Sequence, residues 1–107
     1  RLNKKMDGLE MLAERDVGDS IRIKYPITVN AIPFSDSESD ADLDSSSIVI
    51  SDFEGNEVVN DSLTKNDSGE YYFEWETKDL SAGDFKVKVV AEVDGKQEVE
   101  KGFIRLV

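Results

Sequence analysis

Apolar and polar side chains alternate along several segments of this chain. The longest alternation covers residues 21–31, and shorter ones cover residues 71–77 and 85–93. A period of two residues is typical of β-strands that bury one face. The apolar run at residues 48–50 predicts a further strand, and Glu57-Val58-Val59, after a turn-forming sequence, predicts a short partner strand. Together with the apolar C-terminus, the pattern predicts an all-β, antiparallel β-sandwich of about seven strands.

Two residues sharpen this prediction. Pro26 has no N–H group to donate to a neighbouring strand, so the segment 21–31 lies at a sheet edge, bends at Pro26 or changes sheets there. Trp75 shares a strand face with Tyr71 and Phe73. Because alternate residues of a strand point to the same side, we expect Trp75 to lie in the core between the sheets.

The two C-terminal strands flank the turn sequence at residues 93–95. A three-residue loop there places Lys88 opposite Glu100 on the outer face and Phe85 opposite Phe103 on the inner face. A two-residue turn shifts the register by one residue and sets Lys88 against another lysine. We therefore predict the three-residue loop.

The first fifteen residues have a different period. Leu2, Met6, Leu9 and Ala13 follow one another at spacings of four, three and four, which predicts a short amphipathic helix. Because so short a helix is marginal in water, it must dock on its own domain, dock on a neighbouring subunit, or fray. We expect a docking segment at residues 1–16 and a sandwich domain at residues 17–107. The predicted contact residues of the docking segment are Leu2, Met6, Leu9 and Leu12.

The chain is strongly acidic. Its 107 residues include 24 Asp and Glu against 13 Lys and Arg, which gives a formal charge of −11. Phosphate backbones and anionic lipid surfaces repel such a protein, so we expect no nucleic-acid partner. No apolar run approaches the roughly 20 residues that span a bilayer, so we expect no membrane insertion.

Residue types also limit the chemistry. The chain has no cysteine and no histidine, which excludes disulfides, thiolate zinc sites, cysteine nucleophiles and histidine bases. Glu74 and Glu76 form a carboxylate pair of the kind that glycoside hydrolases use, but so many acidic residues create such pairs by chance. Tyr71 and Trp75 could stack on a sugar or pack in the core, and their alternating positions favour the core. We expect no enzyme, and we predict Tyr72 as a surface aromatic contact.

The acidic residues are concentrated in one part of the sequence. No Lys or Arg occurs between Lys24 and Lys65, and five carboxylates there stand at every second position. These five are Asp36, Glu38, Asp40, Asp42 and Asp44. Carboxylate oxygens suit Ca²⁺, so the segment predicts a calcium site, although it lacks the glycine and the final glutamate of an EF-hand. The alternative is a solvated acidic loop. No other cofactor is expected.

Several short motifs resemble those of prokaryotic and viral immunoglobulin-like domains. They are G-D-S at residues 18–20, I-S-D-F-E-G-N at 50–56, D-S-G-E-Y at 67–71 and A-G-D-F at 82–85. The segment 67–73 also resembles the D-S-G-x-Y-x-C signature of immunoglobulin variable domains, with Phe73 in place of the cysteine. The resemblance implies an immunoglobulin-like sandwich over residues 17–107, with Tyr71 as its tyrosine corner. Such modules occur in cell-surface proteins, in adhesins and as accessory parts of tailed-virus particles.

These observations predict a non-catalytic structural or interaction module. We expect protein partners, either further copies of the chain or neighbouring structural subunits, and an oligomer within a larger assembly. The start of the sequence does not resemble a signal peptide, which favours a virion component made in the host cytoplasm, such as a head, neck or tail accessory protein. The alternative is a cell-surface adhesion domain, or a carbohydrate- or calcium-binding domain, of a prokaryotic surface protein.

Overall fold

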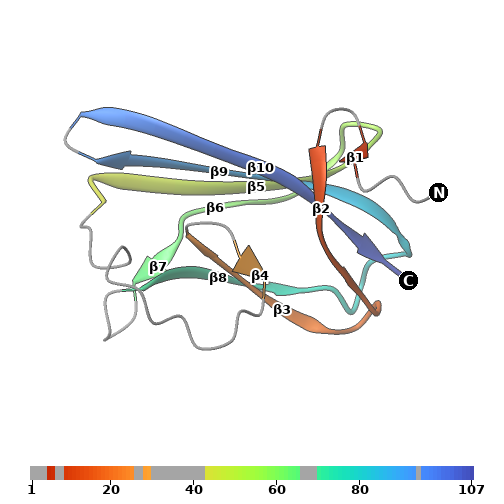
Figure 1. The fold of residues 1–107 in the computed structure, drawn as a ribbon. Helices are drawn as coiled ribbons and strands as arrows, with labels where there is room; N and C mark the ends of the chain where they lie inside the picture. The colour runs from red at the N-terminus through yellow and green to blue at the C-terminus, as the bar shows by residue number, and fades with distance from the viewer. Residues whose placement is uncertain (1–4, 7–8, 26–27, 30–42, 66–69, 94) are drawn as a thin grey trace.

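The computed structural model describes residues 5–6, 9–25, 28–29, 43–65, 70–93 and 95–107. Within these ranges the chain forms ten strands and no helix (Figure 1). The strands are β1 (Lys5–Met6), β2 (Leu9–Arg15), β3 (Ser20–Tyr25), β4 (Thr28–Val29), β5 (Ser45–Asp52), β6 (Glu57–Asp61), β7 (Thr64–Lys65), β8 (Tyr71–Glu76), β9 (Gly83–Val93) and β10 (Lys96–Leu106). Seven of them are five residues or longer, and one of these seven, β2, lies in the segment where a helix was predicted.

The strands form two sheets that face each other (Figure 1). The six-stranded sheet has the order β1-β2-β10-β9-β5-β6, and the four-stranded sheet has the order β4-β3-β8-β7. All neighbouring strands are antiparallel except β2 and β10, which are parallel. The predicted all-β sandwich is therefore confirmed at the level of fold class.

The core lies between the two sheets and consists of the alternating apolar residues. Trp75 of β8 is only 2% exposed, and its ring meets the edge of Phe85 of β9 at a centroid distance of 5.5 Å. The inward position predicted for Trp75 is confirmed. The other members of the buried cluster are Ile21, Ile23, Ile48, Ile50, Leu63, Val87, Val89, Ile104 and Leu106.

The long strand predicted over residues 21–31 is interrupted. β3 ends at Tyr25, and β4 turns back to pair with it, with Thr28 opposite Lys24 and Val29 opposite Ile23. A proline cannot donate a ladder hydrogen bond and restricts the residue before it, so the strand ends before Pro26. The described residues therefore form two paired strands of one sheet in place of the single long strand predicted, and the three alternatives for Pro26 itself lie outside them.

The predicted N-terminal helix is wrong. Leu9–Arg15 is the strand β2, which pairs in parallel with β10 and places Met11 opposite Phe103. Leu12 packs against the core from this strand. An isolated helix of this length is marginal, whereas the edge of β10 offers a row of backbone hydrogen-bonding groups. The spacing of the apolar residues therefore reflects contacts with the sheet.

The predicted contact residues of the N-terminal segment are placed in part. Leu9 and Leu12 lie half-buried in β2, the backbone of Met6 lies in β1, and Leu2 is outside the described residues. β2 is hydrogen-bonded into the six-stranded sheet of its own chain. A role of residues 1–16 in docking to another subunit stays a prediction.

The register predicted for the last hairpin is also wrong. Lys96 pairs with Val93, so Lys101 lies opposite Lys88 and not Glu100. The observed pairing is that of the two-residue turn. Gly95 has a φ of 77°, the left-handed conformation that such a turn requires.

Core packing explains this register. It turns Ile104 and Leu106 into the core, with Ile104 opposite Phe85. The predicted register would have directed Ile104 and Leu106 outward and Lys101 inward. Burying two large aliphatic side chains outweighs one favourable surface charge pair, which is worth less than about 1 kcal/mol.

Thr77 joins the end of β8 to the turn between β2 and β3. Its fully buried hydroxyl donates to the Asp19 carbonyl at 2.8 Å and accepts the Gly18 N–H at 2.9 Å. We expect Thr77→Val to lower the free energy of unfolding by about 1–3 kcal/mol, because the Gly18 N–H loses its partner and the Asp19 carbonyl keeps only the backbone N–H of residue 77, at 3.3 Å. Chemical denaturation measures the change. Thr77→Ser keeps the hydroxyl, so an equal loss in both variants would contradict this role.

Candidate functional site

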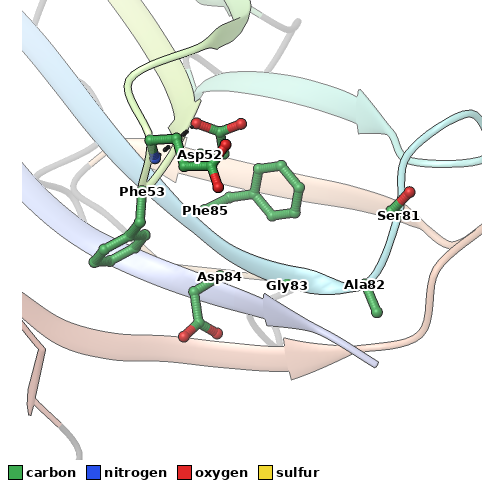
Figure 2. Close-up of a pocket in the computed structure, with 8 residues that line it drawn as sticks. Asp52, Phe53, Ser81, Ala82, Gly83, Asp84 and Phe85 are labelled. Atoms are coloured by element: carbon green, nitrogen blue, oxygen red, sulfur yellow. Dashed lines mark hydrogen bonds between the residues drawn. The ribbon is translucent and has the colours of Figure 1, made fainter.

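A recess of about 500 Å³ lies at one end of the sandwich (Figure 2). It lies between the β5–β6 turn and the segment that enters β9, and the ring of Phe85 lies between these two segments. The recess brings together two of the motifs that carry the family resemblance, at residues 50–56 and 82–85. Its lining residues are Asp52, Phe53, Glu54, Ser81, Ala82, Gly83, Asp84 and Phe85.

Asp52 holds the β5–β6 turn in place. Its carboxylate accepts hydrogen bonds from the backbone N–H groups of Glu54 and Asn56, both at 2.9 Å, and from the Asn56 side chain at 3.0 Å. The bonds from Asn56, first from its side chain and then from its backbone, lower the pKa of Asp52 below its ordinary value. Asp52 is therefore an ionised turn-stabilising residue.

Asp84 is likewise engaged within the molecule. The Arg105 guanidinium donates from Nε to Oδ1 at 2.8 Å and from Nη2 to Oδ2 at 3.2 Å. This two-point contact raises the pKa of Arg105, through the hydrogen bond first and the charge of Asp84 second. Glu54 has an exposed carboxylate on the rim. Of the three carboxylates that line the recess, two stabilise the local fold.

Aromatic residues extend from the recess to the outer face of the six-stranded sheet. Phe53 meets Phe103 edge-on at a centroid distance of 6.0 Å, and the Lys86 ammonium lies 5.1 Å from the centre of the Phe53 ring. Phe103 points away from the main core yet is only 1% exposed. Phe53, which is half-buried, is therefore the aromatic side chain of this group that remains accessible beside the exposed Glu54 carboxylate.

The predicted calcium ligands are seen only at their C-terminal end. Asp36, Glu38, Asp40 and Asp42 lie outside the described residues. Asp44 donates its N–H to the Glu92 carbonyl at 2.6 Å, and its carboxylate accepts the Gly95 N–H at 3.3 Å. The described part of the chain contains no group of three or more acidic side chains placed to hold a metal. The calcium site stays a prediction. It is tested by comparing the melting temperature of the protein with and without a calcium chelator.

Tyr72 lies on the outer face of the four-stranded sheet and is half-buried. The Arg22 guanidinium carbon lies 4.3 Å from the centre of its ring, and Arg22 also forms a 2.9 Å ion pair with Glu74. Glu76 accepts a hydrogen bond from Ser20 at 2.7 Å. Glu74 and Glu76 therefore bind neighbouring side chains, and Tyr72 as a contact for a partner stays a prediction.

Tyr25 provides a pH-dependent contact between the sheets. Its hydroxyl donates to the Glu98 carboxylate of β10. Burial first, and then the hydrogen bond and charge of Glu98, raise the pKa of Tyr25 from 10.0 to about 12. The resulting stabilisation is fully present below pH 10 and is lost as the pH rises toward 12.

We therefore expect Tyr25 to ionise only near pH 12. Tyrosinate absorbance, followed while circular dichroism reports a folded chain, measures this step. Tyr25→Phe should remove it, and Glu98→Gln should move it to lower pH. An unchanged absorbance step near pH 12 in the Tyr25→Phe variant would contradict the contact.

The sequence did not indicate the recess, because its two segments are distant along the chain. The available signal was the repeated D-F pair at residues 52–53 and 84–85. No helix within the described ranges is long and apolar enough to cross a membrane. Comparisons of the chain with protein-family models, with curated proteins and with solved structures returned no match.

Proposed function

We propose that this chain is a non-catalytic, immunoglobulin-like module that acts through protein–protein contacts in a larger assembly. The strand order supports the immunoglobulin-like assignment. β3, β8 and β7 correspond to strands B, E and D, and β5, β9 and β10 to strands C, F and G, with β6 as the additional C′ strand.

One detail of the resemblance changes under this assignment. Tyr71 begins β8, at the place of strand E, whereas a tyrosine corner begins strand F. Its hydroxyl accepts the N–H of Leu43, which lies far upstream in the sequence, at 3.1 Å. Under this assignment the D-S-G-E-Y motif precedes strand E, so its likeness to the variable-domain signature does not extend to the strand position.

The observation that carries the functional proposal is that two of the carboxylates lining the recess form hydrogen bonds within the protein itself. Asp52 holds a turn and Asp84 holds Arg105, so the two carboxylates nearest the apolar floor maintain the fold. A catalytic pair of carboxylates needs groups free to exchange protons with a substrate. The broad outer surface of the six-stranded sheet is better suited to contact with another protein.

The assembly that best fits the resemblance is a tailed-virus particle, with the chain as a head, neck or tail accessory protein. Immunogold labelling of purified particles with an antibody against the chain tests this proposal. Labelling at a regular position on the particle supports it. Cell-envelope labelling in place of particle labelling, together with heat of binding on adding Ca²⁺ or glycans in calorimetry, overturns it and favours the cell-surface alternative.

A further inference from the structure

The last strand of the six-stranded sheet has an open edge. β6 pairs with β5 and, among the residues that the structure describes, has no strand on its other side (Figure 1). A strand with one neighbour leaves every second backbone N–H and C=O group pointing away from the sheet. Such groups can bind an extended segment of another protein, which then continues the sheet. We call this side of β6 the open edge.

Acidic side chains flank the open edge on both faces of the sheet. Asp61 is paired with the buried Ile48 and so lies on the face toward the core. Glu57 is paired with Ser51, which lies on the outer face. Both carboxylates are exposed, as is that of Glu54 in the turn before β6. None of the three forms an ion pair with a described residue, so a strand added here meets negative charge on both of its faces.

A bulge limits the length of the open edge. β6 has one residue more than the facing part of β5, and this extra residue, Val58, is 38% exposed. A bulge increases the local twist and shortens the stretch along which another strand can pair. Regular pairing is therefore available at residues 59–61, with Val58 as an apolar contact beside it. So short a backbone contact needs support from side-chain charges.

The charge of the chain determines which partner can give this support. No Lys or Arg lies within residues 25–64, and the whole chain carries a formal charge of −11, so the local and the overall charge have the same sign. A phosphate backbone is repelled. A second copy of the chain is repelled as well, and pairing two open edges would bring carboxylates together. A segment rich in lysine and arginine is attracted by both charges.

We propose that the open edge of β6 binds an extended segment of a partner protein that is rich in lysine and arginine, and that this segment pairs with the β6 backbone as an added strand. Its basic side chains contact Glu57 on one face and Asp61 on the other. The inference rests on the proposed role in protein–protein contacts and specifies the chemistry of the partner. Because the carboxylates are exposed, high salt weakens the contact.

Fluorescence anisotropy at low salt tests the charges, with a labelled synthetic peptide of repeated Lys-Lys-Val as the probe. When extended, this peptide has basic side chains on both faces. The wild-type chain should bind it, and E57K/D61K should raise the dissociation constant by about tenfold or more. E10K/D16K is the matched control. It changes the net charge equally at two exposed residues in and beside β2, toward the other end of the sheet, and should have a clearly smaller effect.

A second peptide tests the added strand. It has the same sequence with an N-methyl group on every backbone nitrogen, which keeps the charges but removes all backbone N–H donors. It should bind about tenfold or more weakly than the first peptide, because the backbone contact is lost. Amide hydrogen exchange gives the position: the unmethylated peptide should slow exchange in β6 and leave exchange in β2 unchanged.

Thermal melting verifies that each variant is folded. No binding to the wild-type chain, equal effects of E57K/D61K and E10K/D16K, or equal binding of the two peptides would each overturn the proposal. The particle-labelling experiment does not depend on these outcomes, so failure of the β6 contact and failure of the proposed function are distinguishable.

Discussion

Replacing Trp75 with alanine is expected to lower the free energy of unfolding by about 3–5 kcal/mol. Trp75 is the largest residue of the core, is 2% exposed and lies edge-to-face with Phe85 across the two sheets. Its removal leaves a cavity that rigid β-sheets fill poorly. Small domains are stable by only about 5–15 kcal/mol, so the variant should be partly unfolded at moderate temperature.

Urea denaturation followed by circular dichroism measures this loss. Trp75→Phe keeps an aromatic ring against Phe85 and should lose clearly less than the alanine variant. Val58→Ala, at an exposed position of β6, is a control that should change stability by less than about 0.5 kcal/mol. If Trp75→Ala had no greater effect than Val58→Ala, Trp75 would not lie between the sheets.

Gly102→Ala is expected to lower the free energy of unfolding by an amount near the upper end of about 1–3 kcal/mol. A β-carbon added at Gly102 would lie 2.5 Å from Cγ of Leu12 and within 2.9 Å of both of its terminal carbons. Since the branch carbon and both terminal carbons of Leu12 are involved, this half-buried side chain must leave its position against the core. Differential scanning calorimetry should record a lower melting temperature.

A double-mutant cycle makes this prediction specific. In the Leu12→Ala background the β-carbon at residue 102 has space, so Gly102→Ala should have a much smaller effect. The coupling tests directly whether β2 packs on β10. Additive effects of the two substitutions would mean that the N-terminal segment does not lie over Gly102.

Local patterning predicted the body of the sandwich well. The alternation at residues 71–77 placed Trp75 inside, and the β5–β6 hairpin formed around the predicted turn at residues 52–56. These features depend on neighbours along the chain, since a strand with one apolar face needs only a second such face to bury it. The turn has the Asp52 hydrogen bonds that such sequences favour.

The wrong predictions concern segments whose structure depends on pairing with a strand that is distant in the sequence or on contacts with the core. A spacing of three and four residues in the first fifteen residues is compatible with a helix, but the open edge of β10 made residues 9–15 a strand. The register of the last hairpin was predicted from pairs of opposite charge. The observed register is instead the one that buries Ile104 and Leu106 in the core. The pairing of Lys88 with Lys101 depends on this register, and the recess depends on the pairing of β5 with β9, so neither was predicted.

By itself the sequence determined the all-β class, the inward position of the alternating apolar residues and the acidity of the chain. Only the tertiary structure decided that the N-terminus joins the sheet, that Lys88 lies beside Lys101, and that residues 52–54 meet residues 81–85. The physical reason is the distance along the chain over which each kind of interaction acts. Periodicity and turn preferences act between residues close in the chain, whereas strand order and register are set by burial and hydrogen bonding between segments far apart in it.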